Sequence, residues 1–223
     1  MEPQILIFLF LLLVVTGIVF AWLASQKRKQ ELAAWAAAHG LNFDPDKFHG
    51  LDDRFPDFDC FRQGSDRYAQ NAMGGYWGGR EFLGFDYHYE TGSGDDRHTY
   101  LFSAVILRSA VPLRPLWIRP EGFFDKVAAF LGAEDINFES AEFSRQFYVK
   151  SPDRKWAYDV IHPLTIEFLL GAPRFKIKFS PTHVVAFRDK RFSPEEFADA
   201  AGVIAGILDR LPEYLVRQQE GVG

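Results

Sequence analysis

The sequence contains a single cysteine, Cys60, so no disulfide can form within the chain. A domain of this size needs none, and the count is typical of a protein in a reducing compartment. Basic residues are also outnumbered by acidic ones, since the chain has 25 Lys and Arg and 30 Asp and Glu, for a net charge of −5. An acidic chain lacks the basic face that displaces counterions from phosphates. The composition therefore argues against nucleic-acid binding.

Recognised catalytic and cofactor motifs are absent as well. Residues 74–79 (GGYWGG) have neither the G-K-[ST] end of a P-loop nor the G-x-G-x-x-G spacing of a dinucleotide loop. Ser93 lies between glycines but not in the G-x-S-x-G elbow of a hydrolase. Cys60 follows the negatively charged Asp59, which disfavours a reactive thiolate. We expect no cofactor, and we favour a binding role over an enzymatic one.

Charge is missing entirely from residues 4–25 (QILIFLFLLLVVTGIVFAWLAS). A helix of about 20 apolar residues crosses a hydrocarbon core roughly 30 Å thick. A cleaved signal peptide would have a basic start, a shorter apolar core and an A-x-A-like site. This chain begins with Met-Glu-Pro-Gln, and residues 21–24 (AWLA) fit the cleavage pattern poorly. The pattern predicts an uncleaved single-pass span whose partner is the lipid bilayer.

Three basic residues, Lys27, Arg28 and Lys29, follow the span directly, and none precedes it. The positive-inside rule then places the C-terminal part of the chain in the cytoplasm. We expect an anchor at residues 1–26, a basic juxtamembrane helical stalk at 27–40 and one globular domain at 41–223. The expected location is the cell membrane.

The remaining sequence shows strands in pairs and helices interspersed late in the chain. Tyr87 and its alternating neighbours have the period-2 pattern of a half-buried strand, and Ser193-Pro194-Glu195-Glu196 has the pattern of a helix start. The sequence predicts an α+β fold with a mainly antiparallel sheet built from hairpins. Strands are expected at residues 67–77, 81–91, 98–108, 116–118, 143–150, 174–179 and 184–188, and helices at 121–131, at 155–170 with a break near Pro163, and from 194 onward.

From Leu41 onward the layout resembles a group of uncharacterised bacterial proteins that carry an N-terminal anchor and a domain of unknown function. The resemblance covers most of the domain, and its motifs are turns, caps and core aromatics. It implies the architecture and a bacterial setting, and it implies no activity. The residues that carry it are Gly40-Leu41, Phe85-Asp86-Tyr87, Arg119-Pro120-Glu121, Phe138-Glu139-Ser140, Glu142-Phe143 and Phe147-Tyr148-Val149.

One polar cluster is a candidate for chemistry. By alternation, Asp86, His88 and Glu90 share one strand face, and we expect His98 to lie opposite Glu90 across the loop at residues 92–96. Imidazoles and carboxylates within reach of one another can bind a divalent metal. A solvated strand shows the same pattern, and no recognised ligand spacing is present. The cluster is therefore a weak catalytic candidate and no firm metal site.

A basic hairpin is the clearest local contrast in this acidic chain. Its cations could meet anionic headgroups at roughly 1 kcal/mol per residue, or an acidic partner. Alternatively, lysines guard an edge strand against the addition of further strands, and we favour this interpretation. The candidate lipid- or partner-binding residues are Arg174, Lys176, Lys178, Arg188, Lys190 and Arg191.

Three functions remain open. The leading hypothesis is a non-catalytic binding or scaffolding module at the inner membrane face, with a possible protein partner there. The second is a membrane-tethered, metal-assisted hydrolase, and the third is a module that binds anionic lipid.

Overall fold

A computed structural model describes residues 3–121 and 136–220 of the chain. The strands are β1 (Asn42–Asp44), β2 (Ser65–Trp77), β3 (Arg80–Thr91), β4 (His98–Arg108), β5 (Leu116–Pro120), β6 (Phe147–Lys150), β7 (Lys176–Phe179) and β8 (His183–Phe187). The helices are α1 (Pro3–Ala38), α2 (Leu51–Arg54), α3 (Ala141–Gln146), α4 (Arg154–Val160), α5 (Pro163–Gly171), α6 (Pro194–Leu208) and α7 (Glu213–Glu220), with short 3-10 turns η1 (Asp59–Phe61) and η2 (Gly94–Asp96).

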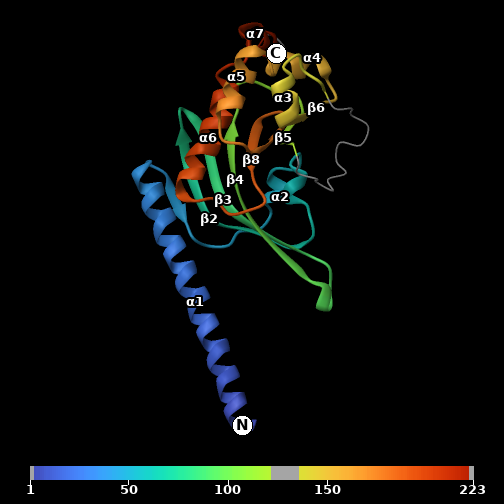
Figure 1. Ribbon diagram of the computed structural model, residues 1–223. Coiled ribbons are helices and arrows are strands. Elements are labelled where there is room, and N and C mark those ends of the chain that lie inside the picture. The colour runs from blue at the N-terminus through green and yellow to red at the C-terminus, as the bar shows by residue number, and fades with distance from the viewer. Residues whose placement is uncertain (1–2, 122–135, 221–223) are drawn as a thin grey trace.

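The eight strands form one open sheet in the order β1-β2-β3-β4-β8-β7-β5-β6, and every neighbouring pair is antiparallel. The predicted α+β class with a mainly antiparallel sheet is confirmed (Figure 1). The β2–β3 hairpin turns at Gly78 and Gly79, whose φ angles are +53° and +79°. Positive φ at both turn residues matches the twist of the strands and explains why glycine stands there.

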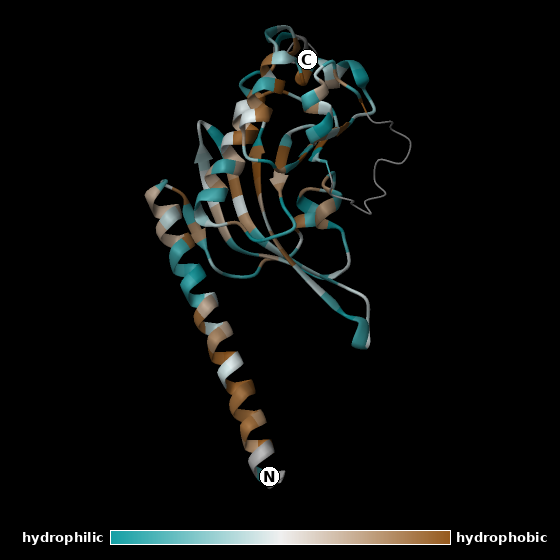
Figure 2. Ribbon diagram, in the orientation of Figure 1, coloured by the Kyte–Doolittle hydropathy of each residue, from teal (hydrophilic) through white to brown (hydrophobic). Residues whose placement is uncertain are grey.

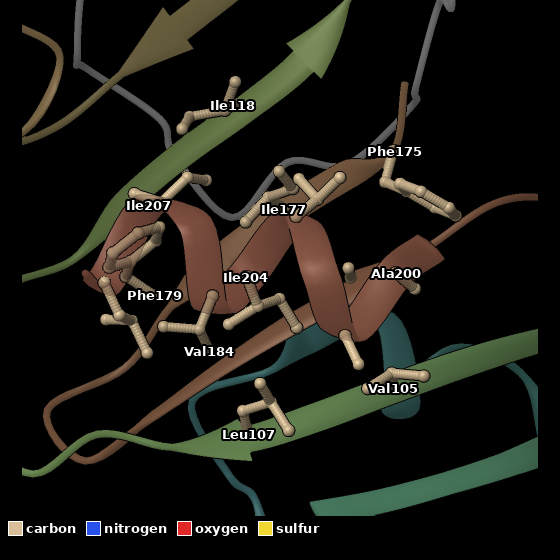
Figure 3. Close-up of a cluster of buried hydrophobic side chains, with 14 of the residues drawn as sticks. Val105, Leu107, Ile118, Phe175, Ile177, Phe179, Val184, Ala200, Ile204 and Ile207 are labelled. Atoms are coloured by element: carbon tan, nitrogen blue, oxygen red, sulfur yellow. The ribbon is translucent and has the colours of Figure 1, made fainter. Parts of the chain in front are cut away.

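Helix α6 covers one face of the sheet. It begins with the predicted capping box, in which the Ser193 hydroxyl accepts from the Glu196 amide and the Glu196 carboxylate accepts from the Ser193 amide. Its apolar stripe then packs on the central strands. Figure 3 shows the side chains that meet there: Ala200, Ile204 and Ile207 from α6, and Val105, Leu107, Ile177 and Val184 from the strands beneath.

The opposite face carries a second, aromatic core. Residues 51–61, which include α2 and η1, fold over it and bury Phe58 and Phe61 against Phe85 and Tyr87 of β3. The Tyr87 hydroxyl donates to the Phe61 carbonyl oxygen at 2.6 Å, which fastens this cover to the sheet. Both faces of the sheet are therefore buried near its centre.

Helix α1 is continuous from the apolar segment into the domain. Among the described residues it is the one helix long and apolar enough to cross a bilayer. Its N-terminal half projects away from the domain and is strongly apolar (Figure 2), with large side chains such as Ile7 and Phe20 exposed. Its last turns lie against the domain, and Gly40, with φ of +67°, ends the helix.

Of four local predictions, one is confirmed, two are wrong in whole or in part, and one lies almost wholly outside the described residues. The helix break near Pro163 is confirmed, because α4 and α5 flank residues 161 and 162. The strand predicted at 143–150 is wrong in its first half, where the Ser140 hydroxyl accepts from the Phe143 amide and starts α3. The helix predicted at 121–131 lies almost wholly outside the described residues. The interpretation of residues 174–179 as an edge strand is also wrong, since β7 lies between β8 and β5.

Candidate functional site: the joint between α1 and the sheet

One face of α1 continues from the basic cluster into the core of the domain. Arg28, Leu32, Trp35, Ala36 and His39 follow the spacing of a single helical face. Leu32 and Ala36 are completely buried in the same core as the α6 stripe. Part of the segment 27–40, which the sequence predicted to be a stalk, is therefore packed on the sheet and on α6. These five residues of α1 and the residues that they contact on the sheet and on α6 form a joint that links the apolar helix to the domain.

Arg28 enters this joint and pairs with Asp86 of β3. The Arg28 Nε donates to Asp86 Oδ2 at 2.7 Å, and Nη2 donates to Oδ1 at 2.5 Å, so the pair is bidentate. The Asp86 side chain has no exposed surface and that of Arg28 is 16% exposed. The remaining guanidinium nitrogen, Nη1, donates to the Phe192 carbonyl oxygen at 2.9 Å, just before α6. One side chain thus joins α1, β3 and the start of α6.

Two neutral side chains complete the shell around Asp86. Asn71 donates to Asp86 Oδ2 at 2.9 Å, and the Ser103 hydroxyl donates to Oδ1 at 2.6 Å. Asn71 has φ of +53° at a bulge in β2, a conformation that asparagine tolerates better than most residues. Asp86 therefore accepts four hydrogen bonds, and neither oxygen is open to a substrate. The geometry assigns this carboxylate to structure rather than to acid–base chemistry.

An aromatic stack supports the joint about two turns beyond Arg28 along α1. The Trp35 ring lies 6.0 Å from Trp77 of β2, 4.2 Å from His39 and 6.1 Å from Phe197 of α6, measured between centroids. Such aromatic pairs contribute beyond the area they bury. The joint therefore combines a buried ion pair with apolar packing, which holds α1 at a defined angle to the sheet.

The four residues predicted to form one polar cluster do not converge. Asp86 is taken up by Arg28, while Glu90 pairs with Arg97, with its Oε2 3.2 Å from Arg97 Nη1. His98 is exposed and lies opposite Thr91, so the expected pairing of His98 with Glu90 is wrong by one residue. Thr91 pairs with His98, so residues 92–97 connect the two strands, and Glu90 lies opposite Thr99.

A different trio forms nearby. Asp66, His88 and Glu90 offer ligand atoms that all lie within 4.8 Å of one another. The His88 ring stacks on Tyr68 at 4.3 Å, and its Nδ1 lies 2.9 Å from the Asp66 carbonyl oxygen. Because a carbonyl only accepts, this contact favours the tautomer with the proton on Nδ1, and Nδ1 also lies 3.8 Å from Asp66 Oδ2. The trio is a possible divalent-metal group with one histidine and two carboxylates.

The predicted basic hairpin places its cations beside acids. Lys178 of β7 is almost fully buried, contacts the Asp59 carboxylate and lies 3.7 Å above the Trp117 ring. Burial lowers the pKa of the Lys178 ammonium from 10.5 to about 7, although the Asp59 carboxylate in contact with it favours the charged form. The Lys178 amine is therefore buried in an aromatic setting and presents no charge to the surface.

This burial predicts a pH dependence of stability. Between pH 7 and 9 the unfolded chain keeps the Lys178 proton and the folded chain releases it, so stability should rise by up to about 1.4 kcal/mol per pH unit. Urea unfolding of the full chain in detergent at pH 7, 8 and 9 measures the slope. Lys178→Met should flatten it, whereas Lys190→Met, at a lysine whose side chain is 62% exposed, should leave it unchanged. Equal slopes in the two variants would refute the assignment.

Four of the other five predicted basic residues, all except Arg191, line a cleft of about 440 Å³ together with acids. Lys176 donates to Asp189 at 2.8 Å, and Arg188 and Lys190 both contact Glu196. Arg174 donates to Gln146, and Arg191 is exposed. The walls of the cleft are Pro120, Glu121, Arg174, Phe175, Lys176, Arg188, Asp189 and Lys190. Internal pairing neutralises much of the charge that the sequence suggested for a lipid surface.

Sequence reasoning missed Arg28, Asn71 and Ser103 as partners of Asp86, and Asp66 as a neighbour of His88. Arg28 was assigned to the positive flank of the span, where nothing indicated burial. Arg28 and Asp86 are 58 residues apart, so no local spacing could have joined them. Asp86 shares its strand face with the polar residues His88 and Glu90, so the local pattern gave no signal of a buried arginine partner.

The sequence matches no protein-family model and no curated protein. Among solved structures, the chain is similar to the crystal structure of the mycobacterial trehalose monomycolate transport factor A, with a TM-score of 0.62 and 12% identity. The match covers 81% of this chain and 92% of that one. At this identity the likeness shows a shared α+β fold.

Proposed function

We propose that this chain is a non-catalytic binding or scaffolding module, held at the cytoplasmic face of a membrane by its N-terminal helix. The observation that carries the proposal is the Arg28–Asp86 pair inside a continuous α1. A tether that only kept the domain nearby would need no such joint. A helix locked to the sheet presents the same surfaces of the domain to the bilayer plane in every copy.

The cytoplasmic orientation rests on the basic flank. Arg28 is paired in the folded domain, but topology is set as the helix inserts, when all three of Lys27, Arg28 and Lys29 still carry free charge. Because Cys60 is buried, a single exposed cysteine can report the side of the membrane. Tyr76→Cys, at an exposed position of β2, should react with an impermeant maleimide only after cells are permeabilised. Labelling in intact cells would refute this orientation.

The solved structure with the same fold is described as a transport factor. By analogy, we propose that this chain serves a membrane assembly as an accessory component rather than as the transporting protein. Within residues 3–121 and 136–220 only α1 is long and apolar enough to cross a bilayer, and one helix provides no path for a solute. In-cell crosslinking of the full chain should capture membrane proteins. The same set should be lost when a soluble domain replaces residues 1–25, and a set that persists would count against a membrane role.

The metal-assisted hydrolase is the second candidate, and the Asp66–His88–Glu90 trio favours it. Metal content of the purified full chain after incubation with zinc or manganese decides between the two. The scaffolding proposal expects less than stoichiometric metal, unchanged by His88→Ala. One bound ion per chain, lost in His88→Ala but kept in His98→Ala, would favour the enzyme. Anionic-lipid binding through the basic hairpin is tested by vesicle co-sedimentation, and the internal pairing of its cations leads us to expect little.

The resemblance to membrane-anchored bacterial domains of unknown function and the domain boundaries at residues 26 and 40 stay predictions.

A further inference from the structure

Strand β4 has an edge that its neighbour leaves unpaired. On one side β4 pairs with β3 along its whole length, from His98 to Leu107. On the other side β8 pairs only with Ala104 to Arg108, and one more bond runs from the Ser103 amide to the Lys190 carbonyl oxygen. Within residues 3–121 and 136–220, no backbone group bonds to residues 98–102 on that side.

The orientation of the free backbone groups follows from this ladder. The amides of Ser103 and Ser109 donate away from β3, toward Lys190 and Thr182. Because successive residues of a strand alternate, the amide and carbonyl groups of Thr99 and Leu101 point to the same free side. Four main-chain hydrogen-bonding groups are thus arranged to receive another strand.

The residues of this edge do not protect it. Natural edges are guarded by lysines, prolines or inward-pointing charges. Residues 99–102 (TYLF) carry no charge and no proline, and three of them, Thr99, Tyr100 and Phe102, are β-branched or aromatic. Tyr100 and Leu101 are 44% and 36% exposed. An unguarded edge of this composition can accept an added strand.

The charge and the position of this edge indicate what kind of segment binds there. Residues 89–102 form an arm whose three acids, Glu90, Asp95 and Asp96, outnumber its one arginine, Arg97, which already pairs with Glu90. Asp95 and Asp96 are exposed at the tip. In Figure 1 the arm extends from the sheet toward the end of the molecule that holds the N-terminus of α1, the direction of the bilayer. Cytoplasmic flanks of integral membrane proteins are rich in Lys and Arg.

We propose that the β4 edge at residues 98–102 docks an extended, basic juxtamembrane segment of another integral membrane protein. The segment adds as a strand to β4, and its cations contact Asp95 and Asp96. This inference rests on the proposed membrane anchor and specifies the partner of that module. Main-chain bonds to Thr99 and Leu101 supply affinity, and the acidic tip selects a basic sequence.

A second copy of this chain is a poorer occupant. Antiparallel pairing of two β4 edges needs a two-fold axis perpendicular to the strands. Because the arm and α1 point the same way in Figure 1, that axis would turn one apolar helix away from the shared bilayer. A partner with its own span has no such restriction.

The test is photocrosslinking in cells with p-benzoylphenylalanine placed at Tyr100 of the full-length chain. Tyr76 is the matched control, an exposed tyrosine on β2. Tyr100 should give an adduct with an integral membrane protein, and Tyr76 should not. The adduct should persist with Leu101→Ala, which keeps the outward amide, and fall by about tenfold with Leu101→Pro, which removes it. The double change Asp95→Lys and Asp96→Lys, at exposed positions, should also reduce it without affecting the fold.

Other results would overturn the proposal: an adduct with the chain itself or with lipid alone, no adduct at Tyr100, or equal yields with Leu101→Ala and Leu101→Pro. Thermal unfolding midpoints of the variants exclude loss of the fold as the cause. Alkaline carbonate washing separates the two proposals. If the wash releases the full chain, the membrane module fails; if the chain stays in the membrane and Tyr100 gives no adduct, only the docking edge fails.

Discussion

Replacing Arg28 with alanine is expected to lower the free energy of unfolding by about 3–5 kcal/mol, because it leaves the Asp86 carboxylate buried without its cation. For a chain of this size that corresponds to a fall of roughly 10 °C in the unfolding midpoint. Asn71 and Ser103 still donate to Asp86 in the variant, which limits the loss. Circular dichroism of the full chain in detergent measures the effect.

Lys27→Ala is the matched control, because Lys27 precedes Arg28 on the same helix. The Lys27 side chain is 77% exposed and pairs with Glu31 in the next turn. Its expected cost is below about 0.5 kcal/mol. The double variant Arg28→Met, Asp86→Leu should be less destabilised than the sum of its single changes, because no lone charge remains buried. Equal effects of Lys27→Ala and Arg28→Ala would show that the ion pair does not hold the joint.

Trp35→Ala is expected to cost about 2 kcal/mol, since it removes a half-buried indole that packs against Trp77 and Phe197. The same helix supplies a control of equal size. Trp22 is 59% exposed on the apolar half of α1, so Trp22→Ala should leave the unfolding midpoint within about 1 °C. Limited proteolysis reports the consequence for the joint, because residues 29–41 should become cleavable only in Trp35→Ala. Protection of that segment in both variants would contradict the prediction.

Together these variants separate attachment from orientation. Arg28→Ala and Trp35→Ala both leave residues 4–25 intact, so the chain should remain in the membrane while the angle between α1 and the sheet becomes loose. If the module works through a fixed orientation, the Tyr100 adduct should fall in Arg28→Ala even though docking residues 98–102 are unchanged. This result would connect the joint and the arm through the rigidity of the sheet between them.

The predicted catalytic cluster shows which part of a site can be identified from residue patterns. Alternation correctly placed Asp86, His88 and Glu90 on one face of β3. It did not reveal that Arg28 arrives over this face from α1 and occupies the acid, because the approach depends on the packing of Leu32 and Trp35. The trio with Asp66 depends on a bulge in β2, a departure from regular pairing that alternation cannot express.

The basic hairpin gives a similar lesson. The pairing of β7 with β8 follows from adjacent runs and a short turn, and it was predicted. The place of this pair in the sheet was not, because β5 comes from sixty residues earlier and adds to the outer side of β7. As a result Lys178 is buried beneath Asp59 and next to Trp117, where the pattern suggested a solvent-exposed guard.

The sequence by itself determined the features that arise within a few residues: the uncharged apolar helix, the capping box at Ser193, and the hairpin at Gly78-Gly79. These depend on hydrogen bonds and side chains three or four positions apart, or on backbone angles that glycine alone adopts freely. Only the tertiary structure decided the order of the strands, the partner of Asp86 and the unpaired edge of β4. Each of these depends on how all elements together bury apolar surface, and that sum is not contained in any single segment.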